Sequence, residues 1–574
     1  MWFAFLLAQV FVALVAGGAA TEALLSAVQN TDDCPTCLAL LGAFQTIALT
    51  GDDAFIVEFT SLCIGLGAAD PDVCTGLIEL EGPILAHDLR LINTTGQTAE
   101  KLCDALLGMC VTHPINPFTV PFPKPAPSNP KKFISRGRPP IRVAHLSDVH
   151  IDRMYTIGSE ANCTKPICCR DFADSPAIPT EPALPNGNSH CDSPISLADS
   201  LLEEVERLNP QFSIFTGDVV EGAVWLVAQP EATTDLQAFN EQMASKLTAP
   251  IFPSIGNHDT APVNEFARTT SNAANNSQFV FDTQSAGWEQ WIGPTAAFEV
   301  DHNSGSYWAK VPGLDLRIIA VNTQYWYKQN FWLYDSDVVQ PDPNGIIAFL
   351  VDALQATEDA GERAWIIGHI PLGKEDTMQD QSNYYDQVLQ RYINTIAGQF
   401  FGHSHKDQFE IAYSNYSEQT AANAVSVGLI GPALTPTSGN PAFKFYDIDP
   451  DTFSVVDSSP TSPTPSSKSA PRGLRMNPLS PAFWHNLTEV FAVNETAFQM
   501  FNTFLSRGGA VTACDADCQN TTICDMRAFR SQDNCDTPTP GFQMRRRSTT
   551  SHEHDGCEGS GLAHILSSMV EAAK

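Results

Sequence analysis

Residues 251–259 read Ile-Phe-Pro-Ser-Ile-Gly-Asn-His-Asp, a short apolar run that ends in the polar group Gly256-Asn257-His258-Asp259. The apolar run has the length and composition of a buried strand. The residues after it offer an amide oxygen to a hard cation and an imidazole to a substrate. Four residues alone carry little weight, so the interpretation depends on whether the pattern recurs.

The pattern does recur, because four other apolar, β-branched runs also end in polar residues. The runs and the residues that follow them are Ile141–Leu146 with Asp148-x-His150, Phe212–Phe215 with Gly217-Asp218, Ala364–Ile367 with Gly368-His369, and Ile396–Phe401 with Gly402-His403-x-His405. Strands buried on both faces are typical of α/β sheets, whose ligands gather beyond the carboxyl ends of the strands. We therefore expect five strand ends to bring two Asp, four His and one Asn together.

Amphipathic stretches such as Leu197–Leu208 and Ile346–Ala356 separate these runs. Strands that alternate with helices predict a layered α/β fold for residues 141–456. At 574 residues the chain is long enough for further domains on either side.

The charge and the first residues limit the setting in which the protein works. A formal charge of −33 argues against nucleic acid as a partner, because a phosphate backbone requires a basic surface. Trp2–Ala16 is almost wholly apolar and is followed by small residues, which predicts a signal peptide over residues 1–20. A short membrane anchor is the alternative, although the run is too short for a typical span.

The cysteines and the glycosylation sequons also indicate export. Fifteen cysteines fall into separate groups along the chain. Seven Asn-x-Ser/Thr sequons lie at Asn93, Asn162, Asn275, Asn415, Asn486, Asn494 and Asn520. Together with the signal peptide they predict passage through an oxidising compartment. We expect a secreted or extracellular protein, with a lysosome or vacuole as the alternative destination.

Residues 21–113 contain six of the cysteines, at Cys34, Cys37, Cys63, Cys74, Cys103 and Cys110. Apolar segments of helical spacing lie between them: Leu38–Leu49, Ala54–Leu66 and Ala99–Met109. Six cysteines allow fifteen pairings, and counting does not choose among them. A zinc ribbon is a poor interpretation, because no second CxxC or His pair follows at metal-binding spacing. A small helical bundle stapled by disulfides is the better one.

The segments on either side of the α/β body have biased compositions. Residues 114–140 contain nine prolines and predict an extended spacer, either loose or packed along the surface. Ser458–Ser469, at the start of residues 457–574, predicts a disordered or O-glycosylated connector. Beyond it, Pro481–Phe504 and Ala563–Ala573 have helical periodicity, and the four cysteines between them suggest a small stapled cap. Arg545–Arg547 is either a processing site or a solvated charge run.

The five strand-end pieces resemble the calcineurin-like metallophosphoesterase superfamily over about 300 residues. That resemblance implies two cations, with Asp148, His150 and His405 on one and Asn257, His369 and His403 on the other. Asp218 would bridge them, and a water held between the cations would attack phosphorus. The imidazole-rich ligand set favours two Zn²⁺ per chain, with manganese or iron as alternatives.

Other histidines and acids near these motifs receive separate interpretations. We assign His258, which is not needed as a ligand, to protonating the leaving oxygen or stabilising its charge. His145 lies within its strand and is interpreted as structural. Asp259 and Asp407 are either acceptors that orient ligating imidazoles or residues with surface or turn roles.

The cysteine order of residues 21–113 resembles the saposin family, a helical bundle that handles lipid, and the whole chain resembles the acid sphingomyelinases. The cluster Cys163-x4-Cys168-Cys169 and the segment Asn330-Phe331-Trp332-Leu333 support that resemblance. The two families imply the pairs Cys34–Cys110, Cys37–Cys103, Cys63–Cys74, Cys163–Cys168, Cys169–Cys191, Cys514–Cys518 and Cys524–Cys535. Cys557 would then remain unpaired, in agreement with the odd count.

The chain departs from the acid sphingomyelinase pattern at two places. Gly222 stands where mammalian members carry a second histidine that is not a ligand, and Trp326 stands where a cysteine is expected. Asp218 also lacks the tyrosine three places later that marks purple acid phosphatases.

A set of aromatic residues either lines a choline pocket or packs under loops. These are Tyr307, Trp308, Tyr325, Trp326, Tyr327, Phe331 and Trp332.

The resemblance implies a zinc phosphodiesterase that cleaves sphingomyelin, or a related phospholipid, to ceramide and phosphocholine. The saposin-like domain would bring this monomeric enzyme to a membrane or lipid surface. Two alternatives remain open. The same chemistry could act on soluble nucleotides or other phosphate esters, or the protein could be a lipid-binding scaffold with a silent metal site.

Overall fold

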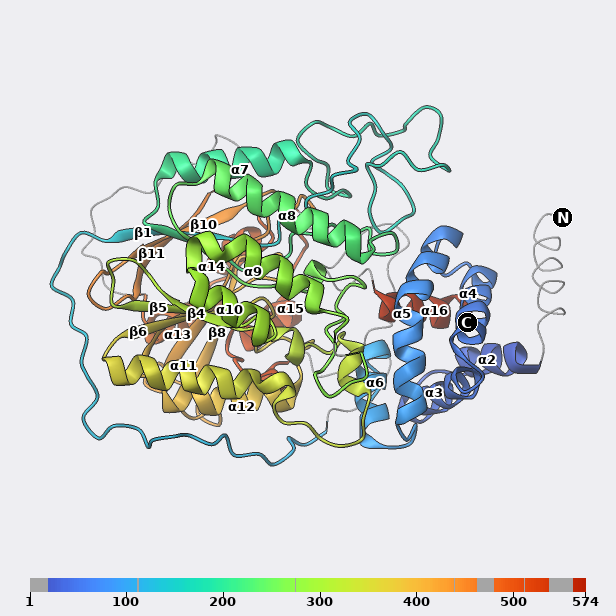
Figure 1. The fold of residues 1–574 in the computed structure, drawn as a ribbon, viewed down its shortest axis with the longest axis horizontal. Helices are drawn as coiled ribbons and strands as arrows, with labels where there is room; N and C mark the ends of the chain where they lie inside the picture. Colours follow the sequence, from blue (N-terminus) through green and yellow to red (C-terminus); the bar gives the residue numbers. More distant parts are fainter. Residues whose placement is uncertain are drawn as a thin grey trace.

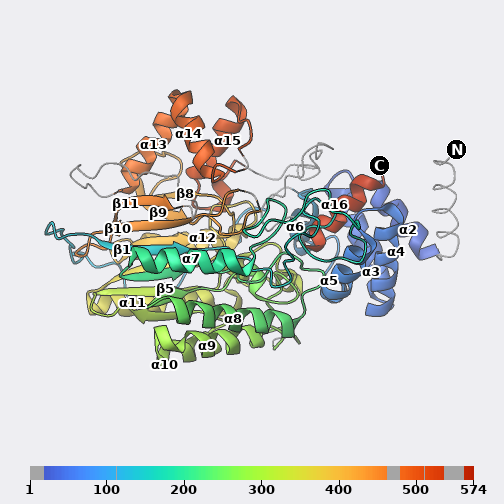
Figure 2. The same cartoon turned by 90° about the horizontal axis from the view of Figure 1, so that it is seen from above.

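The structure, a computed structural model, describes residues 19–110, 113–273, 275–437, 439–461, 479–509, 511–535 and 561–574. The predicted signal peptide therefore lies almost wholly outside the described residues, as do Arg545–Arg547 and Cys557. Figures 1 and 2 show a large α/β body, a helical bundle beside it and a group of C-terminal helices on the body. None of the described helices is long and apolar enough to span a bilayer.

The first sheet of the body has five strands in the order β11-β10-β1-β2-β3. β1 pairs parallel with β2 on one side and antiparallel with β10 on the other. The strands are β1 (Ile141–Leu146), β2 (Phe212–Phe215), β3 (Ile251–Pro253), β10 (Phe443–Ile448) and β11 (Val455–Thr461). β11 extends into the segment predicted to be a connector, so the sheet ends later than the composition suggested.

The second sheet has six strands in the order β4-β5-β6-β7-β9-β8. Its central strands β5, β6, β7 and β9 run parallel, and β4 and β8 are antiparallel edges. The strands are β4 (Tyr307–Lys310), β5 (Leu316–Ala320), β6 (Arg363–Ile367), β7 (Ile396–Phe401), β8 (Gln408–Tyr413) and β9 (Ala424–Ile430). The layered α/β fold is thus confirmed.

Helices flank both sheets, as the amphipathic stretches predicted. α11 packs against β5 and β6, and α9 packs against β3. The helices of the body are α7 (Ile195–Leu208), α8 (Gln229–Lys246), α9 (Gln278–Ile292), α10 (Pro294–His302), α11 (Ile346–Ala360) and α12 (Gln379–Arg391). The buried face of α7 shows the spacing that identified it, with Leu197, Leu201 and Val205 all inside.

The N-terminal bundle contains α2 (Ala19–Gln29), α3 (Cys34–Ala48), α4 (Asp52–Leu66), α5 (Pro71–Leu91) and α6 (Gln97–Leu107). Disulfides join Cys34 to Cys110, Cys37 to Cys103 and Cys63 to Cys74. α5 was not predicted from the sequence, because Gly76, Gly82 and Pro83 interrupt its helical pattern. Gly76 lies where α5 meets the body, since a Cβ there would come 2.2 Å from the carbonyl oxygen of Trp225.

The proline-rich spacer packs along the body and is not loose. Asp380 accepts hydrogen bonds from both the backbone and the side chain of Asn116, each at 2.8 Å. Further along, Lys124 pairs with Asp359 at 2.7 Å and Arg138 with Asp451 at 2.7 Å. Residues 114–140 therefore form a strap that connects the bundle to β1.

The C-terminal helices divide between two places (Figure 2). α13 (Pro481–Val493), α14 (Glu495–Leu505) and α15 (Ala516–Met526) form the cap, in which α13 and α15 pack on the β8 edge of the second sheet. Disulfides Cys514–Cys518 and Cys524–Cys535 staple this part of the chain. α16 (Leu562–Ala572) differs from expectation, because it packs on the N-terminal bundle and not on the cap.

Candidate metal centre

The candidate ligands come from the carboxyl ends of strands in both sheets. Asp148 and Asp218 follow β1 and β2, and Asn257 follows β3. From the other sheet, His369 follows β6, and the pair His403 and His405 follows β7. All of these side chains are buried, as is His150. The two sheets therefore meet at one cluster of nitrogen and oxygen ligands.

Backbone strain concentrates at this cluster. Asp148, His150, Asp218, His403 and His405 all have positive φ, between 36° and 70°. Such conformations cost free energy in residues other than glycine, and they persist where the surrounding structure enforces them. Tight approaches accompany the strain, since a Cβ on Gly402 would lie 2.8 Å from Oδ2 of Asp148.

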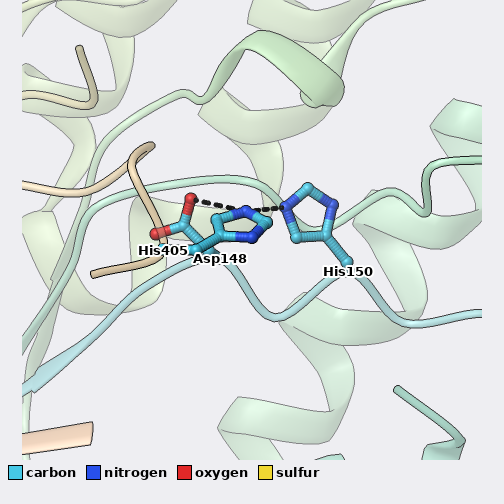
Figure 3. A group of neighbouring side chains, drawn as sticks. All are labelled: Asp148, His150 and His405. Carbon is cyan, nitrogen blue, oxygen red and sulfur yellow. Dashed lines mark hydrogen bonds and ion pairs between the residues drawn. The ribbon is translucent and has the colours of Figure 1, made fainter. Parts of the chain in front are cut away.

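One group of ligand atoms consists of Asp148, His150 and His405, whose ligand atoms all lie within 4.8 Å of one another. Figure 3 shows the three side chains converging. Nε2 of His405 lies 3.5 Å from Oδ1 of Asp148 and 3.1 Å from Nε2 of His150. At these distances the two imidazole nitrogens and the carboxylate oxygen face one another, so their lone pairs suit a cation that all three share.

A second group contains Asp218, His369 and His403. Oδ2 of Asp218 lies 3.1 Å from Nε2 of His369 and 3.4 Å from Nε2 of His150, so a single carboxylate oxygen faces both groups. Oδ1 of Asn257 joins the second group, at 2.8 Å from Nε2 of His369 and 3.0 Å from Nδ1 of His403. The structure thus brings together all seven residues that the strand-end pattern selected.

Hydrogen bonds behind the imidazoles fix which ring nitrogen faces the cluster. Nδ1 of His150 lies 2.9 Å from the carbonyl oxygen of Val220, and Nδ1 of His369 lies 2.7 Å from that of Thr216. A nitrogen that donates to a carbonyl carries the proton, which leaves the other nitrogen as a lone-pair ligand. The donor set of imidazole nitrogens, carboxylates and one amide oxygen therefore fits a pair of transition-metal cations.

Charges within the cluster shift the pKa values of its carboxyl groups. Burial opposes the ionisation of Asp218, but the facing His369, His258 and His150 hold its pKa well below the usual range. Burial raises the pKa of Asp148, against the attraction of His369. One oxygen of Asp218 faces both ligand groups, which is the placement that a bridging ligand requires.

His258 lies at the edge of the cluster. It groups with His150 and Asp218, and its ring centroid is 4.7 Å from that of His150. Burial lowers the pKa of His258 to about 3, which makes the imidazole neutral. Neither ring nitrogen makes a well-formed side-chain hydrogen bond among the described residues. The ring is therefore available to a substrate.

The expectation that Asp259 and Asp407 orient imidazoles is not met among the described contacts. Asp259 accepts hydrogen bonds from the backbone N–H groups of Gly256 and Val219, each at 2.7 Å, and so shapes two ligand loops. Asp407 forms an ion pair with Lys444. Asp259 therefore has the turn role that the sequence left open, whereas Asp407 forms a mostly buried ion pair and has no surface role.

Two residues that the sequence analysis did not select contact the ligands directly. Oδ2 of Asp376 lies 2.7 Å from Nε2 of His403, and Oδ1 of Asn264 accepts a hydrogen bond of 2.8 Å from Nδ2 of Asn257. Asp376 holds His403 with Nδ1 towards the cluster, and Asn264 turns the amide oxygen of Asn257 inward. Both residues lie in loops with no periodic pattern, so no sequence signal marked them.

The other residues singled out from the sequence have structural environments. His145 lies between Oη of Tyr446 at 3.1 Å and Oγ1 of Thr216 at 3.0 Å. The predicted choline-binding aromatics are buried, apart from the half-buried Trp308, and Tyr307 donates a hydrogen bond to the Pro253 carbonyl at 2.8 Å. The packing interpretation of these aromatics is therefore the better one.

At Gly222 the N–H donates to Asp192 at 2.6 Å.

Comparison with known proteins places this centre in a family. A family model described as calcineurin-like phosphoesterase matches residues 141–407. Sphingomyelin phosphodiesterase 2 from Caenorhabditis elegans is 30% identical over 560 residues, which cover 88% of this chain and 88% of that protein. Sphingomyelin phosphodiesterase from Bos taurus is 29% identical over 534 residues, which cover 87% of this chain and 82% of that protein.

A more distant relative matches less of the chain. Acid sphingomyelinase-like phosphodiesterase 3b from Homo sapiens is 25% identical over 419 residues, which cover 67% of this chain and 87% of that protein. The match to the phosphoesterase model includes the residues of both ligand groups, which supports a dinuclear metal site. The chain is therefore a metallophosphoesterase that belongs to the sphingomyelin phosphodiesterase family.

Proposed function

We propose that this enzyme hydrolyses sphingomyelin, or a related phospholipid, to ceramide and phosphocholine. The observation that carries the proposal is the extent of the similarity to sphingomyelin phosphodiesterases. A match over 88% of the chain extends well beyond the catalytic body and reaches into the bundle. A soluble ester would need no such bundle. A lipid substrate must first be drawn out of its membrane or lipid layer, which is a task for the bundle.

The seven clustered residues hold the cations in this proposal. Asp148, His150 and His405 would hold one, Asn257, His369 and His403 would hold the other, and Asp218 would contact both. Two zinc ions would supply Lewis acidity and an activated water for in-line attack at phosphorus. The chain keeps its ligands fixed through Asp376, Asn264 and the carbonyls of Val220 and Thr216.

His258 acts on the leaving group. Its ring lies beside His150 and Asp218 but is not needed as a ligand, and as a neutral imidazole it would donate an N–H hydrogen bond that stabilises the charge on the oxygen that departs from phosphorus. Gly222 leaves the position of the family's second histidine without a side chain. Either His258 works without that helper in this chain, or another residue replaces it.

The domain roles follow from the arrangement. Residues 21–113 form a saposin-like lipid-handling domain, 114–140 the strap, 141–456 the catalytic domain and 457–574 the connector and C-terminal helices. The seven sequon asparagines are all exposed, which is compatible with glycosylation during export of a secreted or lysosomal monomer.

Hydrolysis of the same bonds in soluble phosphate esters is the second candidate. One observation favours it, since α16 packs on the bundle and covers apolar surface there. A panel of sphingomyelin vesicles, phosphatidylcholine vesicles, ATP and bis(p-nitrophenyl) phosphate, with and without chelator, separates the candidates. We expect chelator-sensitive turnover that is fastest on sphingomyelin. Faster turnover of ATP than of either lipid would reject the lipid proposal.

A further inference from the structure

The last helix of the chain lies inside the N-terminal bundle. α16 packs against α2, α4, α5 and α6 (Figures 1 and 2, where the red helix lies among the blue ones). Near its end, Lys574 pairs with Asp32 of the bundle at 2.5 Å. α16 connects to the cap only through residues 536–560, which lie outside the described residues.

The contact between α16 and the bundle is apolar. Leu562, Ile565, Leu566, Met569 and Val570 are each at most 1% exposed. Their spacing of three and four residues places them on one face of the helix, and that face is directed into the bundle. On the opposite face His564, Ser567 and Ser568 are half-buried, and Glu571 and Ala572 at the end of the helix are exposed. An amphipathic helix of this kind covers the same type of surface as an acyl chain does.

The beginning of α16 lies close to the metal centre. The backbone N–H of Leu562 donates to Oε2 of Glu81 on α5 at 3.0 Å. A Cβ on the preceding Gly561 would lie 3.5 Å from Nδ2 of Asn264. Asn264 in turn bonds Asn257, a candidate ligand. A single side chain thus separates the start of α16 from the cation cluster.

The start of α16 is thus connected to the metal centre through Glu81 and Asn264, and the apolar face of α16 lies in the bundle beyond them. A phospholipid needs both places, because its phosphodiester must reach the cations while its chains stay out of water. We propose that α16 occupies the site where the bundle receives the acyl chains of the lipid substrate, and that lipid displaces the helix before turnover. The proposal depends on the lipid substrate proposed above.

Vesicle-induced release of α16 can be measured on the wild-type chain. The metal-loaded protein is mixed with an excess of vesicles of sphingomyelin and phosphatidylcholine, so that lipid remains throughout the measurement. Hydrogen–deuterium exchange is then followed by mass spectrometry. We expect the amides of residues 562–572 to exchange at least tenfold faster with vesicles present, while those of β6 and β7 stay unchanged. Unchanged protection of α16 on vesicle-bound protein would overturn the proposal.

A matched pair of variants tests the consequence for activity. Leu566→Asp with Met569→Asp charges the buried face, and Ser568→Asp with Ala572→Asp places the same charge outside it. We expect the first variant to hydrolyse sphingomyelin several-fold faster than wild type at low lipid concentration, with bis(p-nitrophenyl) phosphate turnover unchanged. The second variant should resemble wild type.

Slower lipid turnover by a buried-face variant that keeps its soluble-ester activity would show that α16 supports lipid binding. That result would overturn the proposal that lipid displaces α16. If that variant fails to fold, the exchange measurement on the wild-type chain decides alone. The outcomes are also separable from the substrate proposal. If vesicles release α16 but no phospholipid is hydrolysed, the displacement of α16 by lipid stands and the proposed hydrolysis of phospholipid fails.

Discussion

Three acidic side chains surround the candidate ligands, and among the described contacts one of them bonds an imidazole. Asp376 lies 2.7 Å from His403, whereas Asp259 bonds backbone N–H groups and Asp407 pairs with Lys444. The difference matters because a carboxylate behind a ligating imidazole fixes its tautomer and raises its basicity. The chain therefore contains a natural comparison between an acid that contacts a ligand and one that does not.

We expect Asp376→Asn to weaken metal binding about 10- to 100-fold, the usual effect of removing such a partner. Asp407→Asn, two residues after His405, is the matched control and should leave metal affinity unchanged. Competition with a chromogenic chelator measures both. Equal affinities in the two variants would remove the positioning role of Asp376.

For His258→Ala we expect full metal content and a loss of turnover of about 10²- to 10³-fold, the usual effect of removing one donor that stabilises developing negative charge. His302→Ala replaces a half-exposed histidine paired with Asp301 and should behave as wild type. Steady-state kinetics and metal analysis of each variant check this. Normal turnover by the His258 variant would withdraw its catalytic role.

Among the helices and strands, those with a clear apolar period or with polar residues at a strand end could be predicted from the sequence. The five strands that carry the ligands were recognised, because buried parallel strands read as apolar runs with polar ends. α5 was missed, because glycine and proline obscure its pattern although tertiary packing against the body maintains the helix. The destination of α16 was also missed, because amphipathicity shows that a helix packs but not on which partner.

The interface of α5 should make stability depend on pH. Burial raises the pKa of Glu81 to about 8 and that of Asp88 to about 7, and Glu265 faces both from the body. In the unfolded chain these carboxyls lose their protons at a lower pH than in the folded chain. Stability should therefore fall as pH rises from about 4.5 towards 8.

Glu81→Gln removes one such group and should reduce that fall by on the order of 5 kcal/mol, since the pKa rises from 4.5 to about 8 and each unit corresponds to about 1.4 kcal/mol. Denaturant unfolding at several pH values measures it. Glu79→Gln, at an exposed position of the same helix, should leave the pH profile as it is in wild type. If the free energy of unfolding changed with pH in the same way in the Glu81 variant and in wild type, the raised pKa of Glu81 would be contradicted.

Across the whole molecule, the cations would connect both sheets, because each ligand group draws residues from each of them. A ligand that binds only the folded state at about 1,000 times its Kd stabilises it by about 4 kcal/mol. We therefore expect chelator to lower the Tm of the wild-type protein by several degrees and zinc to restore it. Asp218→Asn should respond much less. A wild-type Tm that chelator does not change would favour a protein without resident cations.

The position of β1 has a consequence for biosynthesis. β1 pairs with β2, which follows it closely, and with β10, which is translated only after the whole second sheet. A nascent chain that has already emerged as far as His405 holds every cation ligand but still lacks the hairpin that covers the outer edge of β1. An open strand edge invites pairing with other chains. The yield of this enzyme in a cell should therefore depend on chaperones that guard one edge until translation passes residue 461.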